Sequence, residues 1–361
     1  MLNGKSHTEN QECLLKIFEP FRNFKSVIIN SKEFKIVQKF GADLKFITDA
    51  YGLSGPTSNY ACIYCESHLL KPWANGDETK VHKITRTLEK AKATFLNHYA
   101  HQEDRKGYLK STMMHIDFKN IVVDLLHVLI RISEKLIEAL IFILNSNDVD
   151  STSVDFSKRV NLQKFYKILS EKCKITKPYY LSVNEKINLK SLSGSERELI
   201  FKYFEQNSLA NVYSHINEMK PFSEVFNEWW ILYCKIKNYN AGDNLIDLDK
   251  RLKEWLKKYI PFVNTKETTI SPYVHIFVFH MKELLESNGN INFYNQQGLE
   301  KLNSLQTKVY FSNTNRHRNG NEYIKQLMDN RNRTDFRNLD GTIFDLDVNT
   351  NPIQDADDLP Y

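Results

Sequence analysis

The chain has 361 residues, of which 41% are hydrophobic and 26% are charged, and its formal net charge is +5. A chain of this length and apolar content can bury a substantial core and is expected to form about two domains. The N-terminal segment has no apolar stretch typical of a signal peptide, and charged residues interrupt the longest apolar run, 121–144. The sequence therefore predicts neither a secretory signal nor a membrane span.

The N-terminal part of the chain predicts strands and one short helix. Residues 25–30 and 33–40 are rich in β-branched and aromatic side chains and flank a turn-like pair, so we expect two strands. Asp43 then precedes apolar residues at helical spacing, which predicts a helix through residue 51 with Asp43 as its N-cap.

From about residue 86 onward the apolar pattern is helical. Regularly spaced apolar side chains on these segments are expected to form a core. The predicted fold class is α+β and mostly helical. The expected helices span 86–99, 121–145, 161–174, 196–204, 222–237, 245–259, 273–286 and 298–310.

Charge is unevenly distributed near the C-terminus. Residues 301–337 contain eight Lys and Arg against three acidic residues, whereas the last 24 residues carry six Asp and no Lys or Arg. The basic segment is either a solvated face or a surface for phosphate contacts. The acidic segment, 338–361, is predicted to be a disordered tail.

Cysteine usage indicates both a compartment and a metal site. Five cysteines, thinly spread outside one pair, are typical of a reducing compartment, the cytosol or the nucleus, rather than of a disulfide framework. Cys62 and Cys65 have the Cys-x2-Cys spacing of half a zinc site. The cysteines are Cys13, Cys62, Cys65, Cys173 and Cys234.

Two histidine pairs could complete that zinc site. His98 and His101 are one, and His275 and His280 are the other. The second pair is favoured because its spacing lies within the range of zinc-binding pairs and because it lies on a strongly apolar helix. Cys62, Cys65, His275 and His280 would then fill all four positions of a tetrahedral ion, which predicts a structural zinc that joins the two ends of the helical region.

Two carboxylates lie close to these zinc ligands in the sequence. Asp43 comes 19 residues before Cys62, and Glu300 comes 20 residues after His280. Taken alone, Asp43 is explained as an N-cap and Glu300 as a first-turn glutamate that complements the helix dipole. The proposed zinc would nevertheless bring the neighbourhoods of the two carboxylates together.

Six segments carry a resemblance to a known family over roughly residues 40–310. The segments are GADLKF around Asp43, SNYACIYCE around the cysteines, VHKITR at 81–86, VDLLH at 123–127, HIFVFH at 275–280 and GLEKLN at 298–303. With these segments in this order, the chain resembles the Transib transposases and the related catalytic subunit of the V(D)J recombinase, in which an RNase H-like fold carries a large helical insertion.

The resemblance implies a domain organisation. Residues 1–60 would be a partial RNase H-like core that lacks its first strands, and 61–290 a helical insertion closed by the Cys2His2 zinc site. Residues 291–337 would form the C-terminal catalytic-type helix and basic segment, before the acidic tail. The family also has a first catalytic Asp upstream of the second, but residues 1–42 contain no Asp.

The resemblance also implies roles for individual residues. Asp43 and Glu300 correspond to catalytic carboxylates that bind Mg²⁺ or Mn²⁺. His127 matches a histidine near the family's active site; a buried helix histidine is the alternative. The residues expected to approach DNA, with surface solvation as the alternative, are Lys83, Arg86, Lys308, Arg316 and Arg318.

The function implied is metal-dependent DNA strand cleavage and strand transfer in the nucleus. DNA would be the substrate, and a second copy of the chain and an accessory subunit would be partners. Because the first catalytic Asp is missing, we expect this chain to be an incomplete or inactive copy. The alternatives are a domesticated or decayed zinc-containing module that binds DNA or protein without catalysis, and a helical interaction protein with no nucleic-acid history.

Overall fold

A computed structural model describes residues 16, 18–68, 83–96, 105–148, 158–181, 187–263 and 270–296. The fold is α+β and mostly helical, as predicted. The chain divides into two compact units, 1–296 and 297–361, and every described residue belongs to the first. The predicted helix 298–310, the basic segment and the acidic tail lie outside the described residues, and the finer domain boundaries stay predictions.

A two-stranded hairpin follows a short 3-10 helix at Glu19–Phe21. Strand β1 (Ser26–Ile29) pairs antiparallel with β2 (Lys32–Lys35), and Ile29 lies opposite Lys32. Asn30 and Ser31 connect them with φ values of 49° and 64°. Positive φ at both central residues is the mark of a type I′ turn, whose twist matches that of the strands. The two predicted strands are confirmed, although the second ends earlier than expected.

A short parallel pair lies next to the helical region. Strand β3 (Phe40–Ala42) pairs with β4 (Ile121–Val123), with Ala42 opposite Val123. The prediction of a helix starting at residue 121 is wrong for these three residues, which are all buried and all β-branched. A short apolar run that leads into a helix cannot be assigned to strand or helix by periodicity alone.

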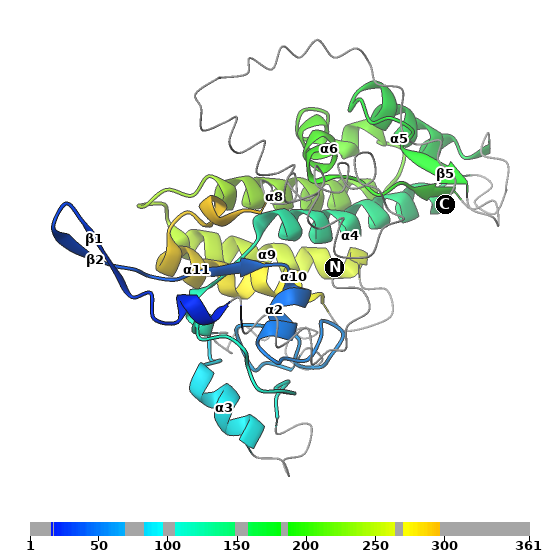
Figure 1. Cartoon of the computed structure of the whole chain (residues 1–361). Helices are drawn as coiled ribbons and strands as arrows, with labels where there is room; N and C mark the ends of the chain where they lie inside the picture. The colour runs from blue at the N-terminus through cyan, green and yellow to red at the C-terminus, as the bar shows by residue number, and fades with distance from the viewer. Residues whose placement is uncertain are drawn as a thin grey trace, which may run out of the picture. The chain divides into compact units, whose positions relative to one another are not determined.

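The core is built around helix α4 (Leu125–Ser146), twelve of whose residues are buried. It packs against the helices α5 (Val160–Glu171), α6 (Gly194–Gln206), α8 (Met219–Lys237) and α9 (Leu245–Val263). Figure 1 shows α4, α8 and α9 running side by side. Between α6 and α8, Phe201 stacks on Phe226 at 4.2 Å between ring centroids. Within the described residues, no helix combines the length and apolar character needed to cross a bilayer.

Shorter elements connect and flank this core. The antiparallel pair β5 (Tyr179–Leu181) and β6 (Ile187–Leu189) was not predicted. Helix α7 (Leu209–Val212) precedes α8, and α3 (Leu88–Leu96) follows the cysteine segment. The segment from 272 to 294 consists of α10 (Pro272–His275), a π-helical turn (Ile276–His280), α11 (Met281–Asn288) and a 3-10 helix (Ile291–Tyr294). The π-helical turn packs on α9.

Helix α2 (Leu44–Ala50) leads into the cysteine segment through a tight chain crossing. Gly52 has φ +66°, and a Cβ at this position would lie 2.3 Å from the carbonyl oxygen of Lys110. The Gly52 carbonyl accepts hydrogen bonds from the backbone N–H groups of Leu109 and Lys110. Only glycine fits this backbone approach, because other residues would meet both the strained φ and the clash.

Candidate metal centre

Four buried side chains form a cluster within the helical region whose ligand atoms could hold a metal ion. The sulfur of Cys62 lies 3.4 Å from Nε2 of His280, and the sulfur of Cys65 lies 3.3 Å from Nε2 of His275. The two Nε2 atoms are 2.9 Å apart, and all four ligand atoms lie within 4.8 Å of one another. No side chain in the cluster is more than 2% exposed. The structure thus brings together the four residues that the sequence predicted.

The cluster fits a structural zinc ion. Zinc held tetrahedrally at about 2.3 Å from sulfur and about 2.0 Å from nitrogen keeps neighbouring ligand atoms about 3.3–3.8 Å apart. The two sulfur–nitrogen separations fall in this range, and the nitrogen–nitrogen separation is slightly shorter. Two thiolates and two imidazoles suit zinc rather than a hard cation such as Mg²⁺. Because four protein ligands complete the coordination, the centre can hold segments together but leaves no position for substrate.

A π-helical turn explains how the two histidines share one side of their helix. In a regular α-helix, residues five apart point about 140° away from each other around the axis. The turn Ile276–His280 is π-helical, and the wider turn brings His280 back beneath His275. Single π-turns of this kind are rare and are found mostly at functional sites. The His-x4-His spacing therefore identified the correct histidine pair, although the π-helical turn that brings the two side chains together was not predicted from the sequence.

Tyr64 makes two hydrogen bonds in the loop that carries Cys62 and Cys65, called the cysteine loop below. The backbone N–H of Tyr64 donates to the sulfur of Cys62 at 3.3 Å, and the Tyr64 hydroxyl donates to the carbonyl of Ile121 in β4 at 3.1 Å. Burial raises the pKa of the Cys62 thiol, whereas a hydrogen bond from Cys62 lowers the pKa of Cys65, as does the charge of His275. A cation between the two sulfurs would favour both thiolates, because it removes the repulsion between them.

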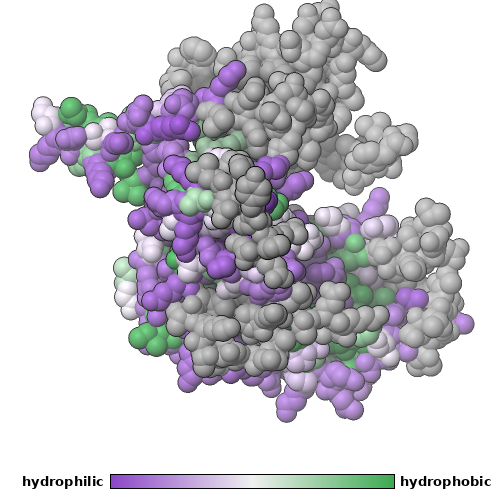
Figure 2. Space-filling model, turned by 90° about the horizontal axis from the view of Figure 1, so that it is seen from below, coloured by the Kyte–Doolittle hydropathy of each residue, from purple (hydrophilic) through white to green (hydrophobic). Residues whose placement is uncertain are grey.

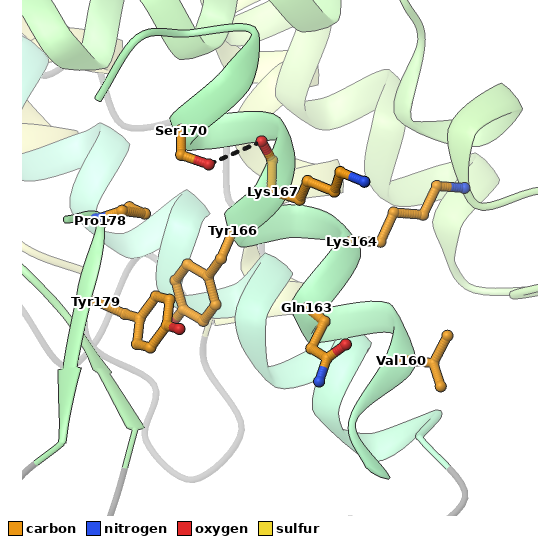
Figure 3. Close-up of a pocket in the computed structure, with 8 residues that line it drawn as sticks. All are labelled: Val160, Gln163, Lys164, Tyr166, Lys167, Ser170, Pro178 and Tyr179. Carbon is orange, nitrogen blue, oxygen red and sulfur yellow. Dashed lines mark hydrogen bonds between the residues drawn. The ribbon is translucent and has the colours of Figure 1, made fainter. Parts of the chain in front are cut away.

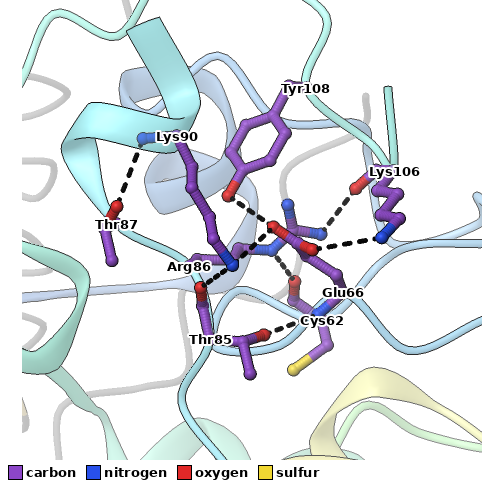
Figure 4. Close-up of polar contacts among 8 residues, drawn as sticks. All are labelled: Cys62, Glu66, Thr85, Arg86, Thr87, Lys90, Lys106 and Tyr108. Carbon is purple, nitrogen blue, oxygen red and sulfur yellow. Dashed lines mark hydrogen bonds and ion pairs between the residues drawn. The ribbon is translucent and has the colours of Figure 1, made fainter. Parts of the chain in front are cut away.

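Arg86 fixes the cysteine loop from within. Its Nε donates to the carbonyl of Cys62 at 2.9 Å, and its Nη2 donates to the carbonyl of Lys106 at 2.9 Å (Figure 4). The same Nη2 donates to the carbonyl of Tyr60 at 3.2 Å. The guanidinium also lies 4.7 Å from the centre of the Tyr108 ring. Arg86 is only 1% exposed. The expectation that Arg86 contacts DNA is therefore at odds with its position, because its Nε and Nη2 donate to backbone carbonyls and its Nη1 is buried.

Charged groups around Arg86 balance one another. Glu66 lies between Lys90 and Lys106, at 3.6 and 3.5 Å, and accepts a hydrogen bond from the Tyr108 hydroxyl at 3.3 Å (Figure 4). Lys83, the other residue of this segment expected to approach DNA, is exposed. Its role in DNA contact stays a prediction.

Asp43 and Asp124 follow the two neighbouring parallel strands. Asp43 comes directly after β3 and caps α2, where its Oδ1 accepts from the backbone N–H of Phe46 at 2.8 Å. Asp124 comes directly after β4 and caps α4. Because the carboxyl ends of parallel strands meet at one edge of a sheet, both carboxylates belong to the same edge. The sequence reasoning did not single out Asp124, although a three-residue apolar run ending in Asp was the available signal.

Asp124 organises the start of α4. Its Oδ2 lies 2.6 Å from Nδ1 of His127, and its Oδ1 accepts from the backbone N–H groups of Leu126 at 3.1 Å and Gln296 at 3.3 Å. A carboxylate can only accept, so His127 donates from Nδ1 to Asp124. The His127 side chain is 18% exposed. It is thus partly rather than fully buried, and its catalytic role stays a prediction.

We expect Asp124→Ala to destabilise the protein by about 2–4 kcal/mol, the sum of a lost N-cap and of charge-assisted hydrogen bonds to a buried carboxylate. Urea unfolding followed by circular dichroism measures the change. Asp117→Ala is the matched control, because Asp117 caps a 3-10 helix with a single bond to Phe118 and should cost about 1 kcal/mol. Equal effects of the two variants would contradict a special role for Asp124.

The remaining site residues named from the sequence lie outside the described residues. They are Glu300, Lys308, Arg316 and Arg318. The pairing of Asp43 with Glu300 as ligands of Mg²⁺ or Mn²⁺ therefore stays a prediction.

A surface pocket of about 440 Å³ lies away from this centre, between α5 and the segment that leads into β5 (Figure 3). Tyr166 and Tyr179 form one wall, with ring centroids 4.7 Å apart. Lys164 at its rim already donates to the carbonyl of Val212 at 2.6 Å. None of the residues predicted to bind metal or DNA lines this pocket.

No protein-family model matches the chain, and comparison with curated proteins finds no match. The functional assignment therefore rests on the residues themselves and on the arrangement just described.

Proposed function

We propose that this chain is a DNA-binding protein of the transposase and recombinase type, with an RNase H-like arrangement whose helical insertion is closed by a structural zinc. The observation that carries the proposal is the position of Asp43. It comes directly after β3, which pairs in parallel with β4, the strand that Asp124 follows, and Cys62 and Cys65 come after α2 in the chain. The order of Asp43 before the Cys-x2-Cys pair is what the resemblance implies for a metal-dependent nuclease core, and the parallel strands beside Asp43 and Asp124 support it.

The chemistry of such a core needs several carboxylates. Two divalent ions, Mg²⁺ or Mn²⁺, stabilise the attacking and leaving oxygens when a phosphodiester bond is cut. Asp43 and Glu300 are the residues of this chain that would hold them. One oxygen of Asp43 caps α2, which leaves the other for a cation. Nuclear localisation, a homodimer and an accessory subunit follow from the same resemblance and are part of the proposal.

A second candidate function is a DNA- or protein-binding module without catalysis. It is favoured by the small number of carboxylates that residues 1–361 offer for the proposed core, since residues 1–42 contain no Asp. Two ions are held poorly by two carboxylates, so cleavage by this chain should be weak even if DNA binding is retained.

A combined binding and cleavage assay tests the proposal. We expect the purified chain to bind a fluorescent duplex with an affinity that falls as salt increases, because phosphate contacts release counterions. With Mn²⁺ we expect little or no cutting, and Asp43→Ala should remove any residual cutting without weakening binding. The matched control is Asp49→Ala, an exposed residue on the same helix.

Two outcomes would count against these assignments. Binding that is absent or unaffected by salt would rule out a DNA-binding function for this chain. Strong cutting that survives Asp43→Ala would rule out Asp43 as a metal ligand and would contradict the view that the carboxylate set is incomplete.

A further inference from the structure

The hairpin of β1 and β2 is solvent-exposed along most of its length. Seven of its eight strand residues are exposed, and Val27 is half-buried. Large apolar side chains share this exposure: Ile28 is 73% exposed and Val37 is 62% exposed. Figure 1 shows the hairpin as a two-stranded ribbon apart from the helices, and Figure 2 shows hydrophilic and hydrophobic residues side by side in that region. An isolated two-stranded ribbon is only marginally stable in water, so such exposure calls for a binding partner.

The base of the ribbon is anchored to the rest of the fold. The side-chain Nε2 of Gln38 donates to the carbonyls of Phe21 and Phe24, and its Oε1 lies 2.7 Å from Nε2 of His115. Lys39 donates to Asn120 next to β4 at 3.2 Å. The ribbon is thus attached to the rest of the fold at its base, whereas the residues at its tip are exposed.

The ribbon is strongly basic. Residues 22–39 contain five Lys and Arg and a single acidic residue, Glu33. Among the residues that the structure describes, Lys25, Lys32 and Lys35 form no ion pair, and all three are exposed. Their charge is therefore available to a polyanion.

The two faces of the ribbon differ in composition but each carries a lysine. The register places Val27, Ile29 and Phe34 on one face with Lys32, and Ser26, Ile28 and Glu33 on the other face with Lys35. Each face thus combines one exposed lysine with at least one exposed apolar side chain. A ribbon in a nucleic-acid groove can use lysines on both faces to reach phosphates on either side of the groove.

We propose that the β1–β2 ribbon is a DNA-binding arm that enters a groove of the duplex, an inference that rests on the proposed DNA-binding function. A two-stranded ribbon fits a groove of B-DNA, where lysines along it can reach phosphates. The tip carries Ile28, Ile29 and Asn30. Apolar side chains in such positions can insert against base steps and bend the duplex.

Neutralising the lysines tests the electrostatic part of this inference. Lys25→Gln/Lys32→Gln/Lys35→Gln in the full chain should weaken binding to a mixed-sequence duplex at least tenfold. It should also reduce the slope of log affinity against log salt by up to about 2.7, because each phosphate contact contributes about 0.9. The charge-matched control is Lys172→Gln/Lys174→Gln/Lys177→Gln, three exposed lysines after α5, which should change both quantities far less.

Replacing the two isoleucines at the tip of the ribbon tests the inferred apolar contact with DNA. Ile28→Ser/Ile29→Ser should reduce duplex bending, measured by energy transfer between dyes at the two ends, and lower the affinity while leaving the salt slope unchanged. Circular dichroism and zinc content show that each variant is folded. Equal losses of DNA affinity in the two triple lysine variants, or unchanged DNA affinity in the ribbon variants, would contradict the proposal that the ribbon is a DNA-binding arm. Neither outcome would contradict DNA binding by the chain.

Two further outcomes separate the arm from the proposed function. If the wild-type chain binds no duplex, the proposed function fails and the arm fails with it. If Ile28→Ser/Ile29→Ser changes the oligomeric state seen by light scattering but not the DNA affinity, the ribbon is a protein interface and the inference is overturned.

Discussion

Cys62→Ser is expected to remove the metal and to destabilise the whole helical region. The wild-type chain should contain one zinc per molecule by mass spectrometry of metals, and the variant less than a tenth of that. Zinc binding contributes about 10–16 kcal/mol in small peptides that have little else to hold them together. This chain has a large apolar core of its own, so we expect a loss of about 3–5 kcal/mol, the cost of breaking a buried charged or polar cluster.

The size of the effect follows from where the four ligands lie in the chain. Cys62 and Cys65 come just after α2, whereas His275 and His280 belong to the segment that packs on α9. The ion would therefore close a loop that spans most of the described residues. Without it, two thiols and two imidazoles would remain buried next to one another with no cation between them, which is unfavourable in a low-dielectric interior.

Cys234→Ser is the matched control for this prediction. Cys234 is half-buried on α8 and takes no part in the cluster, so its replacement should leave zinc content unchanged and cost about 1 kcal/mol or less. A strong chelator should lower the melting temperature of the wild type and of Cys234→Ser, but not that of Cys62→Ser. If Cys62→Ser keeps its zinc and its melting temperature, the cluster is not a metal centre.

The helices and the metal cluster were predictable because their signals are local or chemically restrictive. Amphipathic periodicity placed α4, α8 and α9 close to their observed bounds, since a buried stripe repeats every three to four residues. Few residue types bind zinc, and their spacing is constrained, so the ligand set could be chosen among the chain's cysteines and histidines without coordinates. The N-cap role of Asp43 was also predictable, because it depends on its immediate neighbours.

Features that depend on distant contacts were missed or misassigned. Strand β4 was taken as the start of a helix because its identity as a strand comes from pairing with β3, some eighty residues earlier in the chain. The π-helical turn was not expected because no residue pattern distinguishes it from an α-helix. Arg86 was assigned to the surface because a basic residue in the segment VHKITR looks solvated, whereas carbonyl groups of three separate residues enclose it.

Arg86→Ala is the variant that tests this burial, and we expect it to cost about 3–5 kcal/mol. It would remove the guanidinium donors from the buried Cys62 carbonyl and from the less buried carbonyls of Tyr60 and Lys106, and leaving a buried carbonyl without a donor costs about 1–3 kcal/mol. Because the Cys62 carbonyl belongs to a zinc ligand, zinc affinity should also fall by about 10–100-fold, the usual effect of removing a group that orients a ligand. Competition with a chromophoric chelator measures that affinity.

Arg86→Lys distinguishes a structural role from DNA contact because it keeps the positive charge. A lysine has a single nitrogen and cannot reach three carbonyls arranged around a planar guanidinium, so the variant should lose most of the stability that Arg86→Ala loses. If Arg86 instead contacted phosphates, Arg86→Lys would be as stable as the wild type and would bind DNA almost as well. Lys83→Ala, an exposed neighbour in the same segment, is the matched control and should leave both stability and zinc affinity unchanged.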